Sequence, residues 1–137
     1  MIYFDTNVLV YAISKNVDDE NQQKLSIKLL EEAIKDDTIL LSQISLYELA
    51  FILKKLNNSN QFIDEVLEFL SQYILSENIN VYQKVLEIMK NTNSYKSSFD
   101  VYHLAFSEFY NAKLITFDKG FSKFKDFNIE ILQKDTQ

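Results

Sequence analysis

The sequence predicts an α/β fold in which helices cover both faces of a mostly parallel sheet. Short apolar segments alternate along the chain with longer segments whose apolar residues recur at helical spacing. Such alternation produces βαβ units, whose parallel sheet is buried on both faces. The chain of 137 residues is 47% apolar and 25% charged, which is sufficient for one buried core. We therefore expect a single domain over residues 1–137.

Each element follows from local pattern. Ile27, Leu30 and Ile34 illustrate the helical spacing, and the polar run 57–60 marks a turn between two helices. A polar segment, residues 91–98, connects the last two helices. The expected order is a strand at Ile2–Phe4, helices at 8–13 and 23–35, a strand at 38–41, helices at 42–56 and 61–72, a short strand at 73–76, helices at Val81–Lys90 and 99–110, and strands at 113–117 and 128–132.

The scarce residue types exclude several kinds of site. One glycine cannot build a P-loop or a dinucleotide-binding loop, and one histidine cannot build a three-histidine zinc site. Cysteine is absent, so there is no disulfide, thiolate ligand or thiol nucleophile, which agrees with a cytoplasmic protein. Carboxylates remain the obvious catalytic groups, and they are hard oxygen ligands suited to Mg²⁺ or Mn²⁺.

The charge balance bears on possible partners. Net charge is −6, with 14 lysines and no arginine, which argues against nucleic-acid binding over the whole surface. Bound divalent cations would offset part of this negative charge locally. No apolar run is long enough to span a bilayer, and the N-terminus lacks the basic segment of a signal peptide, so we expect no membrane association.

Two aspartates each follow a predicted strand. Asp5 and Asp118 therefore lie at the edge of the sheet where ligands bind in open α/β folds. Thr6 and Asn7 are placed to orient the carboxylate of Asp5 or to cap the helix themselves, and Thr116 is placed to hold the carboxylate of Asp118. The alternatives are structural: Asp5 caps the helix that follows it, and Asp118 is a turn residue.

Glu48 is the only charged residue between positions 38 and 53, in a helix that is apolar on nearly every side. A buried carboxylate is costly unless it is paired or binds a metal, which favours a functional role. The alternative places Glu48 on a narrow solvent-facing stripe together with Ser45 and Ile52.

Asp100 begins a helix, and His103 follows one turn later on the same face. A capping box over residues 97–100 is about as good an explanation of Asp100 as a metal-binding role. A single imidazole favours a packed residue for His103 over a metal ligand. If all four acids converge at one cleft, they repel one another unless a cation neutralises them, and a divalent metal ion resolves that conflict.

The motifs DTNVLVYA, SLYELA, FDVYHLAF and LITFD, in this order, resemble those of the PIN domain family, and within it the toxin nucleases of the VapC kind. The resemblance extends over residues 2–132. It implies a three-layer α/β/α sandwich and a ribonuclease dependent on Mg²⁺ or Mn²⁺. It also implies a catalytic, metal-binding acidic quartet, which here is Asp5, Glu48, Asp100 and Asp118. The supporting polar residues that it implies are Thr6, Asn7 and Thr116.

The resemblance further implies an RNA substrate, a small antitoxin protein as partner, and a homodimer. The chain has Gly120 where many members carry another acidic residue, which leaves one or two metal ions as alternatives. Without arginine, contacts with RNA fall to lysines, for which the candidates are Lys54, Lys55, Lys119 and Lys123.

Two other functions stay open at this stage. One is a non-catalytic PIN-like module that acts through protein contacts. The other is an aspartyl-phosphate phosphatase with Asp5 as the nucleophile. The second is weakened by Asn7, which stands where such an enzyme would have a second aspartate.

Overall fold

The structure is a computed structural model that describes residues 1–76, 78–92 and 98–133. Its sheet has four strands in the order β2-β1-β3-β4, and every pairing is parallel. The strands are β1 (Ile2–Phe4), β2 (Ile39–Leu40), β3 (Lys113–Thr116) and β4 (Ile129–Ile131). The predicted α/β class with a parallel sheet is confirmed.

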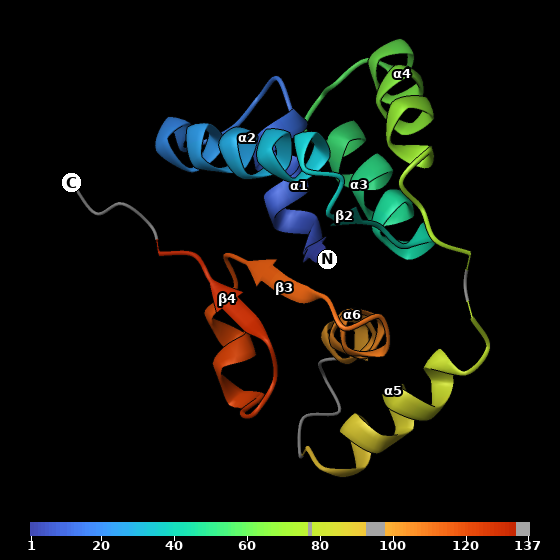
Figure 1. The fold of residues 1–137 in the computed structure, drawn as a ribbon. Coiled ribbons are helices and arrows are strands. Elements are labelled where there is room, and N and C mark those ends of the chain that lie inside the picture. Colours follow the sequence, from blue (N-terminus) through green and yellow to red (C-terminus); the bar gives the residue numbers. More distant parts are fainter. Residues whose placement is uncertain (77, 93–97, 134–137) are drawn as a thin grey trace.

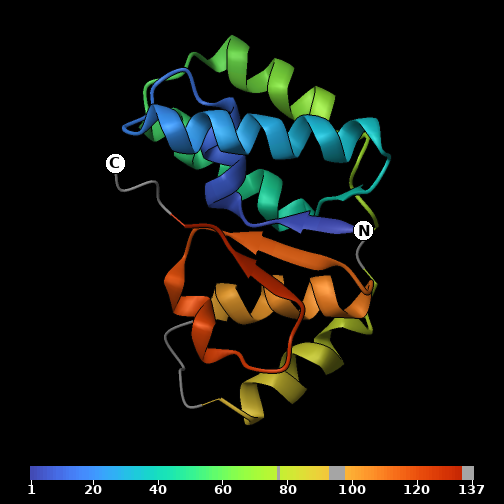
Figure 2. The ribbon, with the colours of Figure 1, turned by 60° about the vertical axis from the view of Figure 1, so that its left-hand side comes forward.

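Helices form a layer on each face of this sheet (Figures 1 and 2). Helices α1 to α4 cover one face, and α5, α6 and the short 3₁₀ helix η1 cover the other. None of the helices built from the described residues has the length and apolar character needed to cross a membrane. The bounds are α1 (Thr6–Ile13), α2 (Glu20–Lys35), α3 (Gln43–Lys55), α4 (Asn60–Ser71), α5 (Val81–Lys90), α6 (Ser98–Phe109) and η1 (Lys119–Lys123).

Two apolar clusters hold the layers together, one on each face of the sheet. Successive side chains of a strand point to opposite faces, so neighbouring residues of one strand enter different clusters. The α1–α4 cluster takes from the strands Phe4, Ile39 and Ile115. The α5–α6 cluster takes Tyr3, Leu40 and Leu114. Every strand that carries the site is therefore fixed from both sides.

Side-chain caps determine where several helices begin. Asp19 accepts hydrogen bonds from the first backbone N–H groups of α2, Ser42 from those of α3, and Ser59 from those of α4. Asp37 and Asn57 adopt positive φ angles of 54° and 65° just after α2 and α3, a conformation that ends a helix.

Apart from shifts of one residue at the ends of elements, the structure differs from the predicted elements in four places. The first helix begins at Thr6 instead of residue 8, and α2 begins at Glu20 instead of residue 23 because Asp19 caps it. Segment 73–76 contributes only an isolated bridge, and the helix η1 was not predicted. The predicted connection over 91–98 lies mostly outside the described residues.

Candidate active site

The order of the strands creates the site. The chain passes from β1 to β2 on one side, and β3 lies on the other side of β1, so the connections diverge at the carboxyl ends of β1 and β3. The Asp5 backbone N–H donates to the carbonyl of Ile115 at 2.9 Å, which continues the ladder one residue past β1. Asp5 and Asp118 therefore come to the same edge of the sheet.

Asp5 is buried, and both of its carboxylate oxygens accept hydrogen bonds. Oδ1 accepts from the backbone N–H of Thr6 at 2.8 Å. Oδ2 accepts from the Thr116 hydroxyl at 2.7 Å and from the Asn7 amide at 3.3 Å. Asp5 is the N-cap of α1, as the structural alternative proposed, but that role engages only Oδ1. The contacts at Oδ2 tie the carboxylate to β3.

Thr116 supports a different acid from the one predicted. Its hydroxyl donates to Asp5, and its oxygen accepts from the backbone N–H of Asp118 at 2.9 Å and from the Asn7 amide at 3.3 Å. The prediction that Thr116 holds the Asp118 carboxylate is wrong, because the parallel register places Thr116 beside Asp5. Asn7 also accepts from the backbone N–H of Phe117 at 3.2 Å, so its amide bridges α1 and β3.

Glu48 reaches the same edge from α3. Its Oε1 accepts from the Thr6 hydroxyl at 3.1 Å and faces Nε2 of His103 at 2.6 Å. The alternative that Glu48 lies on a solvent-facing stripe together with Ser45 and Ile52 is wrong, because Ser45 is 0% exposed. Partial burial raises the pKa of Glu48, but the hydrogen bond and charge of His103 and the bond from Thr6 outweigh it, so the pKa lies below its usual range.

His103 joins the acids to a buried group of hydroxyls. Its ring is 2% exposed, and Nδ1 lies 2.5 Å from the Tyr3 hydroxyl. That hydroxyl lies 2.9 Å from Ser42 Oγ and 2.8 Å from Ser45 Oγ. The sequence did not reveal this role for Tyr3, whose only signal was a polar atom in a strand buried on both faces. The prediction of a packed, non-ligand His103 agrees with this position.

Asp100 and Asp118 complete the acidic edge. Partial burial raises the pKa of Asp100, and the negative charges of Asp118 and Asp5 raise it further, while Lys123 and His103 lower it. Asp118 is exposed, and its Oδ1 accepts from the backbone N–H of Gly120 at 2.8 Å. A Cβ at Gly120 would lie 3.0 Å from that oxygen, so this turn favours glycine. The alternative capping box for Asp100 involves position 97, outside the described residues.

The donor set fits a hard divalent cation. Burial raises the pKa of Asp5, the charge of Glu48 raises it too, and the positive charge of His103 and the bonds from Thr116 and Thr6 lower it. Negative charges held together in this way favour a neutralising cation. Within the described residues, no three acidic or histidine side chains are arranged closely enough to hold an ion between them. Mg²⁺ usually keeps several waters and takes only one or two carboxylates directly.

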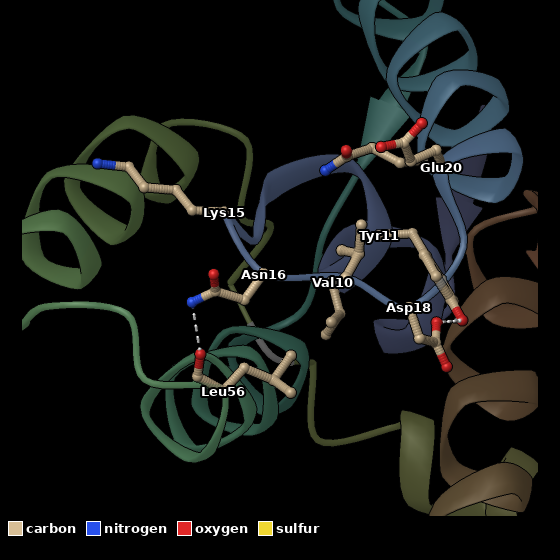
Figure 3. Close-up of a pocket in the computed structure, with 9 residues that line it drawn as sticks. Val10, Tyr11, Lys15, Asn16, Asp18, Glu20 and Leu56 are labelled. Carbon is tan, nitrogen blue, oxygen red and sulfur yellow. Dashed lines mark hydrogen bonds between the residues drawn. The ribbon is translucent and has the colours of Figure 1, made fainter.

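A separate hollow lies at the end of α1 (Figure 3). Its volume is about 640 Å³, and none of the four acids lines it. Tyr11 and Asp18 face one another there and share a hydrogen bond of 2.6 Å. Leu56 forms the opposite wall, where its carbonyl accepts from the Asn16 amide. The hollow is therefore a different place from the acidic edge.

A four-stranded parallel sheet with acidic side chains grouped beyond its β1 and β3 ends defines an α/β protein with a carboxylate site at a topological switch point. The chain belongs to the PIN domain family, whose model, described as "PIN domain", matches residues 2–126. The resemblance seen in the four motifs is thereby confirmed. Members of this family are typically nucleases and generally metal-dependent.

Solved structures share the fold over nearly the whole chain. VapBC2 from Rickettsia felis bound to a DNA fragment from their promoter has 25% identity and a TM-score of 0.71, covering 97% of this chain and 100% of that chain. FitAcB from Neisseria gonorrhoeae has 22% identity and a TM-score of 0.68, and the match covers 94% of this chain and 96% of that chain. A toxin–antitoxin complex from Klebsiella pneumoniae has 18% identity and a TM-score of 0.69, and the match covers 95% of this chain and 96% of that chain. A comparison with curated proteins gives no match.

Proposed function

We propose that this chain is a metal-dependent endoribonuclease that hydrolyses RNA phosphodiester bonds. The observation that carries the proposal is the pair of threonine bridges at the acidic edge. Thr6 donates to both Asp5 and Glu48, and Thr116 contacts both Asp5 and the backbone of Asp118. Three acids that are far apart in the sequence are thus linked, and the charges of Asp118 and Asp5 raise the pKa of the fourth, Asp100.

Asp5, Asp100 and Asp118 would hold Mg²⁺ or Mn²⁺ directly or through water, and Glu48 would act as a ligand or orient a water. When bound, such a cation supplies Lewis-acid stabilisation of charge on the phosphate and makes a nearby water more acidic. Family membership and the all-oxygen donor set support this assignment.

The residues of the chain divide the remaining work. Thr6, Asn7 and Thr116 orient the Asp5 carboxylate. Glu48, whose pKa is lowered, stays ionised and is suited to bind a cation or to orient the attacking water.

Lysines near the acids would bind the RNA phosphates. Lys119 and Lys123 lie in η1 directly after Asp118, and the charge of Lys123 acts on Asp100. Lys54 and Lys55 end α3, where Lys54 donates to Asn60 at 2.6 Å. These positions favour the η1 pair for phosphate contacts.

The biological role in this proposal is that of the toxin of a toxin–antitoxin pair. The chain would act in the cytoplasm as a single domain and a homodimer, and a small antitoxin protein would neutralise it. The support is the likeness to VapBC2, at 25% identity over 97% of the chain.

The test compares the purified wild-type chain with Asp100→Asn on total cellular RNA, with Mg²⁺ or Mn²⁺ and with chelator. Asp64→Asn is the matched control, because Asp64 is an exposed acid on α4. Loss of one acidic group should lower cleavage by roughly 100-fold or more. The control should cleave like the wild type, and chelator should stop all cleavage.

Cleavage that survives both Asp100→Asn and chelator would refute the metal mechanism. RNA or protein binding with no cleavage under any metal condition would instead indicate a non-catalytic module. Hydrolysis of a small phosphomonoester in place of RNA would indicate the phosphatase.

A further inference from the structure

His103 occupies a position that packing alone does not explain. It lies in α6, 2% exposed, and both of its ring nitrogens face polar atoms on other elements. Nε2 lies 2.6 Å from Glu48 on α3, and Nδ1 lies 2.5 Å from the Tyr3 hydroxyl on β1. The ring therefore connects α3, α6 and β1 immediately below the acidic edge.

The direction of these hydrogen bonds follows from the groups involved. An ionised carboxylate only accepts, so Nε2 carries the hydrogen and donates to Glu48. Burial raises the pKa of Tyr3 above its ordinary value, so its hydroxyl keeps its proton and pairs with Nδ1 as a hydroxyl group. Turning the ring over would replace both nitrogens by carbons and lose both bonds.

Tyr3 is itself held in place. Ser42 and Ser45 lie within 2.9 Å of its hydroxyl and of one another. Ser42 also caps α3, the helix that carries Glu48, through a bond from the Ser45 backbone N–H at 3.1 Å. The Tyr3 hydroxyl is thus held by residues at the start of α3, the same helix that carries the Glu48 carboxylate.

The two bonds that described residues make to Glu48 both fall on Oε1. Thr6 and His103 together fix the plane of the carboxylate, which leaves Oε2 as the oxygen presented to a cation or a water. Of the bonds from the described part of the chain, removing His103 would leave Glu48 only the bond from the Thr6 hydroxyl, the longer of the two at 3.1 Å. The side chain would then be free to leave its position.

We infer that His103, oriented by Tyr3, is a positioning residue that holds Glu48 in place for the divalent cation and so sets the affinity of the site for that ion. The inference rests on the proposed function. Outer hydrogen-bond partners of metal-bound side chains typically change metal affinity by about 10- to 100-fold when removed, which gives the size of the expected effect.

The first experiment reads the ring directly. The chain contains one histidine, so its ring ¹⁵N and N–H signals need no assignment variants. We expect a ring with hydrogen on Nε2, and an Nε2–H proton that exchanges slowly in the metal-free wild type and is lost in Glu48→Ala. A ring with hydrogen only on Nδ1 would overturn the inference.

The second experiment measures Mn²⁺ binding by titration calorimetry on the full chain. His103→Leu should bind Mn²⁺ at least about tenfold more weakly than the wild type. His103→Gln should recover part of the loss, because its amide N–H can replace the Nε2 donor. Tyr3→Phe removes only the hydroxyl and should give an intermediate loss.

A role in packing alone predicts a different order, since leucine fills an apolar core at least as well as glutamine. Ser26→Ala is the matched control, because Ser26 is a fully buried hydroxyl on α2, outside this network, and should leave Mn²⁺ binding unchanged. Circular dichroism checks that each variant is folded. If His103→Leu does not fold, Tyr3→Phe and His103→Gln carry the comparison.

The outcomes separate this inference from the proposed function. Wild-type Mn²⁺ affinity in His103→Leu, or in both Tyr3→Phe and His103→Gln where the leucine variant fails to fold, would overturn the role of His103 and leave the nuclease proposal intact. A wild-type chain that binds no Mn²⁺ and cleaves no RNA would overturn the proposed function, and the inference with it.

Discussion

Replacing Thr116 by valine removes a hydroxyl that joins the end of β1 to the end of β3. Thr116 is 0% exposed, and valine has nearly its shape, so the change isolates the hydrogen bonds. The bond to the Asp5 carboxylate at 2.7 Å is of the charged kind, worth about 1.5–3 kcal/mol, and the bond from the Asp118 N–H at 2.9 Å is worth about 0.5–1.5 kcal/mol. We expect Thr116→Val to lower the free energy of unfolding by about 2–4 kcal/mol.

This loss corresponds to a fall of roughly 8–16 °C in Tm for a chain of this size. Urea and thermal unfolding followed by circular dichroism, in chelator at neutral pH, would measure it. Thr38→Val is the matched control, because among the described residues the Thr38 hydroxyl bonds only the Ala33 carbonyl, at 3.4 Å, and a change within about 0.5 kcal/mol is expected.

The pH dependence of the Thr116→Val effect adds a second check. The bond from Thr116 lowers the pKa of Asp5, so it stabilises the ionised carboxylate more than the protonated one. The difference between variant and wild type should shrink as the pH falls and Asp5 becomes protonated. A variant that unfolds within about 0.5 kcal/mol of the wild type at neutral pH, or a difference that grows in acid, would refute the reasoning.

Three further predictions follow from the same charges and backbone. Asp100→Asn should make the metal-free chain more stable at neutral pH and weaken Mn²⁺ binding, as measured by urea unfolding and calorimetry, because burial, Asp118 and Asp5 raise the Asp100 pKa. The pKa values of Asp5 and Asp100 are higher in the folded chain than in the unfolded chain. This difference stabilises the folded chain at a pH below the unfolded-state pKa values, and the stabilisation is lost as the pH rises through the folded-state pKa values. Between mildly acidic and neutral pH, the Tm of the metal-free wild type should therefore rise by less than the Tm of metal-free Asp100→Asn. Saturating Mg²⁺ should remove this difference between the two proteins. Asp37→Gly should gain about 0.5–1 kcal/mol in urea unfolding, because Asp37 has a φ of 54°.

Much of the fold could be predicted because its signals are local. Helix α5 was predicted with its observed bounds, Val81–Lys90, and β1 with its bounds, Ile2–Phe4, since both depend on apolar spacing within a few residues. The start of α2 was placed three residues late because its cap, Asp19, lies in a run of polar residues where any one could serve. Helix η1 was missed because it depends on Asp118 accepting from Gly120, a contact with no periodic pattern.

The candidate site was predictable as a set of residue types but not as a network. Acids after strands, and one acid in an apolar helix, are visible in the sequence. The partner of Glu48 is not visible, because His103 lies 55 residues away from it, and Tyr3 lies 100 residues before His103 along the chain. The prediction that Thr116 holds the Asp118 carboxylate is wrong for a similar reason, since only the pairing of β1 with β3 shows that Thr116 lies beside Asp5.

The division of the apolar interior into two clusters has a consequence for how such a chain can diverge. Leu49 packs on one side of the sheet and Phe106 on the other, and the strands lie between them. Substitutions in one cluster can be accommodated by neighbours in that cluster, so each helical layer is free to drift in sequence separately. The strand ends contact both layers at once, so a substitution that shifts a strand from either side also shifts the acids that follow it.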